Sequence, residues 1–193
     1  MTATAHVDTF VRDNLPPREL WPELRFDLPE LQYPSHLNCA AELLNEDHGE
    51  RTAILWPSGR WTYAELGAKV DRIAHVLVDD LGLVPGNRVL LRGANGPMLA
   101  AAVLAVWKAG CVAVPTMPLL RAPELRAIIN KAQVNAALCA ASLCEELDRA
   151  CEAGGPLKHV VHFGAPQEDL ERRMAAKGEP FVAVSTASDD PCL

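Results

Sequence analysis

Short apolar runs alternate with helix-like segments over residues 89–163, and this alternation constrains the fold more than any other feature of the chain. Four runs have the length and the bounding signals of buried strands: Val89–Leu91, Cys111–Val114, Ala136–Cys139 and Val160–Phe163. Helices are expected between them, over residues 97–110, 123–131 and about 142–153. Strands and helices at this spacing form β-α-β crossovers, so the sequence predicts an α/β fold with a mainly parallel sheet flanked by helices.

The segment before the alternating region predicts a β-hairpin that leads into a long helix. Strand-like runs at Thr52–Trp56 and Arg60–Tyr63 are joined by a Pro-Ser-Gly turn. Thr62 and Glu65 have the spacing of a capping box, and apolar residues then recur at helical spacing as far as Leu81. This is the strongest local helix signal in the chain.

Two weaker signals also predict helices. Ser142 and Glu145 have the spacing of a second capping box, which would open the helix that precedes the last predicted strand. A further short helix is expected at Cys39–Leu44.

Residues 1–35 are expected to form an extended arm in front of an α/β subdomain that comprises residues 36–193. Prolines recur too often for a long helix, so the arm is predicted to hold one short helix at most; they are Pro16, Pro17, Pro22, Pro29 and Pro34. The arm has too many apolar side chains for a free tail, so we expect it to pack along another surface and to be loose where that surface is missing.

Charge and hydropathy exclude several classes of partner. The formal charge is -7, from 25 acidic and 18 basic residues, with no basic block, so neither nucleic acid nor an anionic membrane is an expected partner. The longest apolar run, Met98–Trp107, has about half the length of a bilayer-spanning helix. Residues 1–13 lack the basic start and the apolar stretch of a signal peptide, which predicts a cytoplasmic location.

The six cysteines are expected to be mostly buried thiols, since the chain has neither secretory features nor a C-x-x-C pair. One cluster could suggest a metal: Cys139, Cys144 and Cys151, followed by His159 and His162. The two histidines are three residues apart on a predicted strand and therefore point to opposite faces. They are poorly placed for a tetrahedral zinc site, and no metal site is predicted.

Candidate ligand contacts follow two of the predicted strands. Gly93–Gly96 lies between a strand and a helix, where backbone N–H groups can cradle an anion; alternatively, it is a tight turn in which Asn95 caps the helix. Arg92 and Arg121 come after strands, at the sheet edge where α/β proteins bind ligands, although solvated arginines are the competing interpretation. We predict Arg92, Asn95 and Arg121 as contacts for phosphate or CoA. The chain lacks the common phosphate-loop, zinc-protease and serine-hydrolase motifs.

Three stretches of the chain occur in the order and at the separations of one known family: Gly59–Leu66, Pro85–Val89 and Trp107–Pro115. With their T-Y-x-E-L and K-A-G-x-x-x-V-P elements, they resemble the amino-terminal part of the AMP-forming acyl-CoA synthetases, the adenylate-forming superfamily. Asn14–Glu19, Leu31–Pro34 and Thr116–Arg121 look most like 2-aminobenzoate-CoA and benzoate-CoA ligases.

The resemblance implies a two-step reaction for the whole enzyme. A carboxylate, here an aromatic acid, attacks the α-phosphate of ATP to give an acyl-adenylate and pyrophosphate, and the CoA thiol then displaces AMP. ATP, magnesium and CoA are thus the implied cofactors and substrates of the complete ligase.

The match ends at Asp189–Leu193, where members of the family run into their phosphate loop, and we interpret Asp189 and Asp190 as loop residues before a strand. That loop, the adenine and ribose motifs and the lysine of the carboxy-terminal domain have no counterpart here. No catalytic residue is assigned. We expect this segment alone to bind no cofactor and to be inactive without the remainder of the ligase, covalent or separately encoded.

Two alternatives belong to other functional classes. The chain could be a non-catalytic module that binds CoA or a partner protein, because its arm and its unfinished sheet edge offer surface to bury. It could instead be a thiol enzyme, for which Cys111 at a strand end is the candidate nucleophile.

Overall fold

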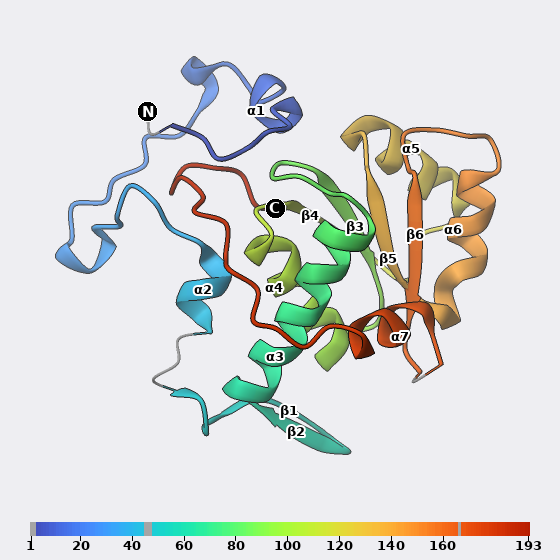
Figure 1. Ribbon diagram of the computed structural model, residues 1–193. Helices are drawn as coiled ribbons and strands as arrows, with labels where there is room; N and C mark the ends of the chain where they lie inside the picture. The colour runs from blue at the N-terminus through green and yellow to red at the C-terminus, as the bar shows by residue number, and fades with distance from the viewer. Residues whose placement is uncertain (1–2, 45–47, 166) are drawn as a thin grey trace.

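The main sheet has four parallel strands in the order β4-β3-β5-β6 (Figure 1). The computed structural model describes residues 3–44, 48–165 and 167–193. All four predicted strands are present: β3 Arg88–Arg92, β4 Val112–Thr116, β5 Ala136–Ala140 and β6 His159–Phe163. Three of them are longer than predicted by one or two residues, whereas β4 starts one residue later and ends two residues later than predicted. The predicted α/β fold with a parallel sheet and an antiparallel hairpin is thereby confirmed.

Helices cover both faces of this sheet because the strands are apolar on both faces. Val89 and Leu91 point into a core with α3 (Tyr63–His75), α4 (Pro97–Lys108) and α7 (Asp169–Ala175). Leu90, between them, points to the opposite face and packs with α5 (Ala122–Ala132) and α6 (Cys144–Cys151). The central position of β3 makes the carboxyl ends of β3 and β5 the topological switch point, where doubly wound sheets bind ligands.

The hairpin pairs β1 (Thr52–Trp56) with β2 (Gly59–Thr62), and α3 follows directly. The first predicted capping box is confirmed: Glu65 N donates to Thr62 Oγ1 at 3.2 Å, and Thr62 N donates to Glu65 Oε2 at 2.8 Å. After α3 the chain widens into a π-helical turn, η4 (Val76–Asp80).

The second predicted capping box is wrong. A 3-10 turn, η5 (Ala141–Leu143), precedes α6, and its presence places Ser142 inside a helical turn instead of at a helix start. Leu143 occupies the cap position of α6 and makes no side-chain cap bond.

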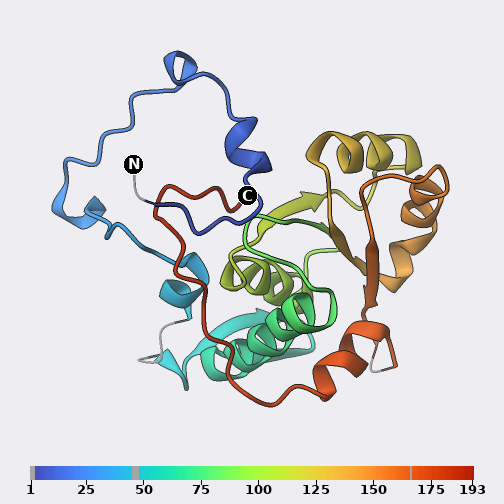
Figure 2. The same ribbon diagram turned by 45° about the horizontal axis from the view of Figure 1, so that its top comes forward.

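The arm has more helical turns than the single one predicted: α1 (Phe10–Asp13), η1 (Arg18–Leu20) and η2 (Pro29–Leu31), before α2 (Cys39–Leu43). Figure 2 shows the middle of the arm as a wide excursion from the body of the molecule. Six of its large apolar side chains are 42–74% exposed: Leu20, Trp21, Leu24, Phe26, Leu28 and Tyr33. They find no covering surface within the described part of the chain.

The C-terminal segment runs from α7 back past α2 to the free edge of β4 (Figure 1). His36 and Ala187 form an antiparallel bridge, and the Asn38 amide donates to Val184 O at 2.9 Å. Ala113 N in β4 donates to Cys192 O at 2.9 Å. Apart from that bond, β4 pairs with β3 alone within the described sheet.

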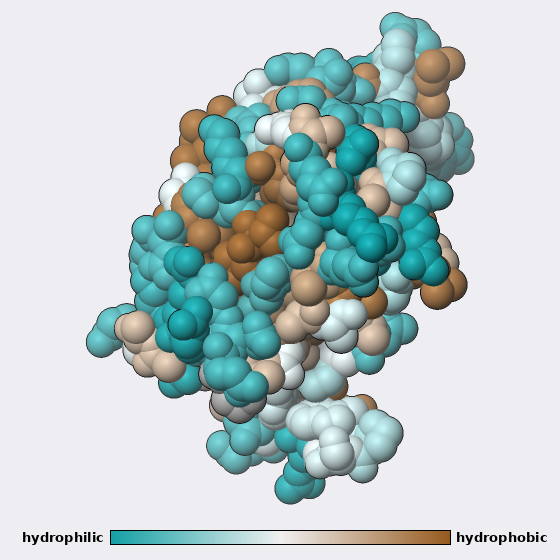
Figure 3. All heavy atoms as spheres, turned by 90° about the vertical axis from the view of Figure 1, so that its right-hand side faces the viewer, coloured by the Kyte–Doolittle hydropathy of each residue, from teal (hydrophilic) through white to brown (hydrophobic). Residues whose placement is uncertain are grey.

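Figure 3 shows the side of the molecule on which α6 lies. Its surface is mainly hydrophilic, with a limited hydrophobic area near the middle. In the part of the chain that the structure describes, no helix combines the length and the apolar character needed to cross a bilayer.

Candidate functional site

Arg92, the last residue of β3, lies at the switch point with 1% of its surface exposed. Its guanidinium donates to the carbonyl oxygens of Met117 at 3.0 Å, Pro118 at 3.0 Å and Leu120 at 2.9 Å, in the loop after β4. Its Nε donates to Leu143 O at 3.2 Å, after β5. Arg92 therefore holds two loops together at the edge where α/β sheets bind ligands.

The interpretation of Arg92 as a solvated arginine is wrong, because the side chain is buried among carbonyl oxygens. Its predicted contact with phosphate or CoA stays a prediction, and that contact would require residues 117–120 to move. A buried guanidinium bonded to four carbonyls has a structural explanation already: each bond satisfies a loop acceptor that helps to offset the cost of burying the charge.

Asn95 is exposed in the turn between β3 and α4. The alternative that it caps α4 is wrong, since Gly96 occupies the cap position and no side chain bonds there. Gly93 packs closely against Phe163: a Cβ at this position would lie 3.0 Å from Cζ of Phe163, so the ring would have to shift slightly. The turn after β3 thus packs against the Phe163 ring, and the predicted ligand contact of Asn95 stays a prediction.

Arg121 occupies the N-cap position of α5, and its side chain is 74% exposed. Its backbone N donates to Glu124 Oε2 at 3.0 Å, and its Nη1 lies 3.4 Å from Glu146 Oε1. The Ala122 N–H bond lowers the pKa of Glu146 further than its partial burial raises it. The structure brings Arg92 and Arg121 to one loop, but within the described residues no hydrogen bond joins Asn95 to either.

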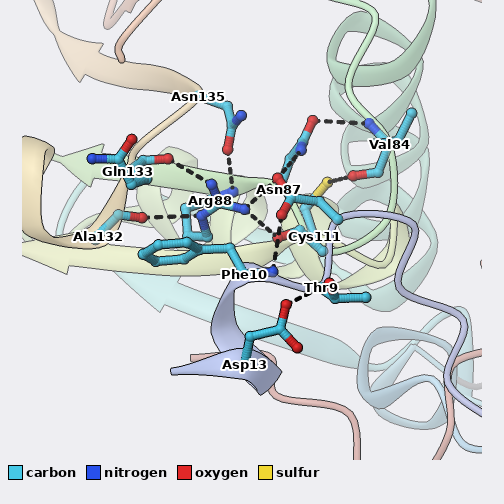
Figure 4. A network of polar contacts seen from close by, with 12 residues as sticks. Thr9, Phe10, Asp13, Val84, Asn87, Arg88, Cys111, Ala132, Gln133 and Asn135 are labelled. Atoms are coloured by element: carbon cyan, nitrogen blue, oxygen red, sulfur yellow. Dashed lines mark hydrogen bonds and ion pairs between the residues drawn. The ribbon is translucent and has the colours of Figure 1, made fainter. Parts of the chain in front are cut away.

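The sequence analysis missed an ionic cluster at the opposite end of β3 (Figure 4). Arg88 donates to Asp8 Oδ2 at 2.5 Å and to the carbonyl oxygens of Gly86, Ala132 and Gln133 at 2.7–3.0 Å. Its guanidinium carbon lies 4.8 Å from the Phe10 ring centroid.

This cluster also controls the charge of Asp8. Burial raises the pKa of the Asp8 carboxyl, but the hydrogen bond from Arg88 and further donors outweigh burial, and the pKa lies below its ordinary value. The cluster fixes the first part of the arm to the start of the sheet. The sequence indicates this cluster only through Arg88, a charged residue directly before the apolar run Val89–Leu91.

Asp190 lies in a loop, as predicted, and it also carries a buried charge that the sequence did not indicate. Its side chain is 2% exposed. It accepts hydrogen bonds from Thr4 Oγ1 at 2.5 Å, Ala5 N at 3.1 Å, Ala187 N at 2.9 Å and Arg12 Nη2 at 2.8 Å. Asp190 therefore joins the N-terminal arm to the C-terminal segment.

The thiols do not form a nucleophilic centre. Cys111, the candidate nucleophile, is 1% exposed, its Sγ lies 3.6 Å from Val84 O, and burial raises its pKa to about 12. Only Cys111 and Cys139 are buried; the other four cysteines are partly exposed, so the prediction of mostly buried thiols holds for two. Among the described residues, no three His, Cys, Asp or Glu side chains converge as a metal site would require.

The structure is a doubly wound α/β domain in which Arg92 joins two loops at the carboxyl edge of the sheet, and the Arg88 and Asp190 clusters join the arm to the body. The chain belongs to the AMP-binding enzyme family, whose model matches residues 42–193.

Relatives and solved structures agree with this assignment. The chain is similar to a benzoate–CoA ligase of Thauera aromatica, with 27% identity over 86% of this chain and 32% of the relative. It is 39% identical to the salicyl-AMP ligase of Mycobacterium tuberculosis over 56% of this chain and 20% of that protein. Its fold matches an anthranilate CoA ligase bound to anthranoyl-AMP, with a TM-score of 0.76, 18% identity, and coverage of 83% of this chain and 31% of that structure. The chain thus spans about a third or less of these proteins.

Proposed function

We propose that this chain supplies the amino-terminal α/β part of an AMP-forming aryl acid–CoA ligase and is inactive by itself. The observation that carries the proposal is the family match over residues 42–193 in a chain that spans 32% of a benzoate–CoA ligase. The names of relatives that act on benzoate, salicylate and anthranilate support an aromatic carboxylate as the acid.

In the complete enzyme, the carboxylate would attack the α-phosphate of ATP, and CoA would then displace AMP. Charge accumulates on phosphate oxygens in the first step, so the site must supply cationic or N–H donors there. The described residues do not fit this requirement. The N–H groups of Arg92 already donate to backbone carbonyl oxygens. No acidic cluster suited to magnesium occurs in the described ranges. We therefore assign this chain no step of the chemistry.

The role that its residues do support is to scaffold a larger sheet. The free edge of β4 borders a groove of about 610 Å³, lined by apolar residues of β4 together with Phe10, Ile128 and Leu193. The apolar side chains of the arm are also uncovered. Free strand edges and contiguous apolar surface are typical of interfaces, so both features favour contact with the remainder of a ligase.

Two measurements test the proposal. The purified chain should show no benzoate-, 2-aminobenzoate- or salicylate-dependent exchange of pyrophosphate into ATP, whereas an intact family ligase assayed beside it should. Exchange by the chain alone would refute its inactivity.

The second test is a chimera in which this chain replaces the matching third of the Thauera benzoate–CoA ligase. We expect benzoate-dependent exchange to be retained at a reduced rate. A chimera that folds, as judged by its unfolding transition, but does not adenylate benzoate would refute the proposed role.

The same uncovered surfaces favour one other candidate, a non-catalytic module that binds CoA or a partner protein. Equilibrium dialysis with CoA separates the two: saturable binding by the isolated chain would favour the module, whereas the ligase-scaffold proposal expects none.

A further inference from the structure

Cys39 and Cys192 come together where α2 meets the C-terminal segment. Both line a small cavity of about 30 Å³, about the space of one water molecule. Trp107 fixes the two elements beside it: its indole N–H donates to Cys192 O at 2.8 Å, and its carbonyl accepts the Asn38 amide at 3.0 Å. Cys39 follows Asn38 as the first residue of α2, so both cysteines are held against the end of α4.

The two side chains line the same small cavity, and Cys39 is near enough to contribute to the raised pKa of Cys192. Burial, and secondly Cys39, raises the pKa of Cys192 to about 11, so the Cys192 side chain is a thiol at neutral pH. A disulfide needs its sulfurs about 2.05 Å apart with little movement of the backbone. Cys39 and Cys192 line one small cavity between elements that Trp107 holds together, so they are the pair best placed to meet this condition.

Among the other cysteines, Cys144 is also near Cys139, but Cys139 is fully buried in β5 and closed to a small-molecule disulfide. Cys111 and Cys139 are buried, and each directs its sulfur at a backbone carbonyl oxygen. Cys144 and Cys151 are partly exposed but lie seven positions apart on α6, or about 10 Å along the helix axis, too far for a bond.

We propose that Cys39 and Cys192 form an oxidation site that closes to a disulfide by exchange with a small-molecule disulfide such as glutathione disulfide. One thiolate attacks the small disulfide, forms a mixed disulfide and releases one glutathione thiolate. The second protein thiolate attacks the mixed disulfide at the protein sulfur and releases the other glutathione. The two protein thiols are oxidised, one glutathione disulfide is reduced to two glutathiones, and the two thiol protons end on these products.

Closure would link the start of α2 covalently to the segment that lies on the free edge of β4. That segment is held in the reduced protein by hydrogen bonds from Trp107, Ala113 and the groups around Asp190. The disulfide would keep residues 190–193 on the body even when those bonds open. This inference does not depend on the proposed ligase function.

The test uses the full chain, incubated with glutathione disulfide or with dithiothreitol and then digested with trypsin without reduction. Cys39 and Cys192 fall in different tryptic peptides, residues 26–51 and 178–193, and each peptide contains no other cysteine. We expect the oxidised sample to contain these two peptides joined, lighter than their sum by two hydrogen atoms. The count of free thiols should fall from six to four.

Matched variants locate the bond. Cys39→Ser and Cys192→Ser should each abolish the joined peptide, whereas Cys144→Ser and Cys151→Ser should leave it unchanged. The oxidised wild-type chain should also unfold at a higher temperature than the reduced one, and dithiothreitol should reverse the shift. A joined peptide that involves another cysteine, glutathione retained on both Cys39 and Cys192, or six free thiols after oxidation would each overturn the proposal.

Discussion

Replacing Asp190 with asparagine should destabilise the protein far more than the same change at Asp189, its neighbour in the chain. The Asp190 carboxylate accepts bonds at both oxygens: Thr4 and Arg12 donate to Oδ1, and the N–H groups of Ala5 and Ala187 donate to Oδ2. An asparagine amide has one oxygen, so its NH2 group must face donors on one side. The substitution therefore removes two acceptor bonds and places donors against donors.

The magnitude follows from burial. Hydrogen bonds to a charged group contribute about 1.5–3 kcal/mol each, and breaking a buried ion pair costs about 3–5 kcal/mol. The Asp190 side chain is 2% exposed, but that of Arg12 is 20% exposed and can regain water. We therefore expect a loss of about 3 kcal/mol, which lowers Tm by about 6–12 °C for a chain of this size. Asp189 is 46% exposed and 3.4 Å from Arg12, so Asp189→Asn should cost under about 1 kcal/mol.

Urea and thermal unfolding, followed by tryptophan fluorescence, measure both variants. Hydrogen exchange adds a local readout, because the amides of Ala5 and Ala187 should lose protection in Asp190→Asn. Equal destabilisation by the two substitutions, or a change below about 0.5 kcal/mol for Asp190→Asn, would refute the reasoning.

Because of this carboxylate, we expect the free energy of unfolding to decrease in acid. Burial raises the pKa of Asp190, but the bonds from Thr4, Ala5 and Ala187 outweigh burial and keep the pKa below its ordinary value. The unfolded chain takes up this proton near pH 4, and the folded chain takes it up only at lower pH. The contribution is therefore complete above about pH 4 and is lost as pH falls through the folded pKa. In Asp190→Asn, the decline of stability in acid should be shallower than in the wild type.

Three further substitutions test other contacts. Arg92→Lys should cost about 2–4 kcal/mol and deprotect the loop of residues 117–120, because an ammonium cannot reach all four carbonyl oxygens; unchanged loop exchange would contradict this. Thr62→Ala should cost about 1 kcal/mol in urea unfolding, whereas Ser142→Ala, which removes no cap bond, should change stability by less than about 0.5 kcal/mol. Phe26→Ser in the exposed arm should leave the Tm of the isolated chain nearly unchanged, and a clear drop would show that the arm packs in solution.

Local sequence determined the elements and their class. Apolar runs bounded by turns became the four strands, and the Thr62 capping box opened α3, because these signals act between residues close in the chain. The parallel arrangement also followed, since strands separated by helices return in the same direction. The same kind of signal failed at Ser142, where a 3-10 turn replaced the expected cap.

Only the tertiary structure decided the roles of the charged residues. Arg92, Arg88 and Asp190 are strand-end or loop residues in the sequence, where exposure is the usual outcome for a charged side chain. Each is buried because its partners come from distant segments: Arg92 bonds to residues 117–143, Arg88 to Asp8, and Asp190 to residues 4–12. Backbone carbonyl and N–H groups carry no sequence signature, so a charge that they satisfy cannot be told from a solvated one until the chain is folded.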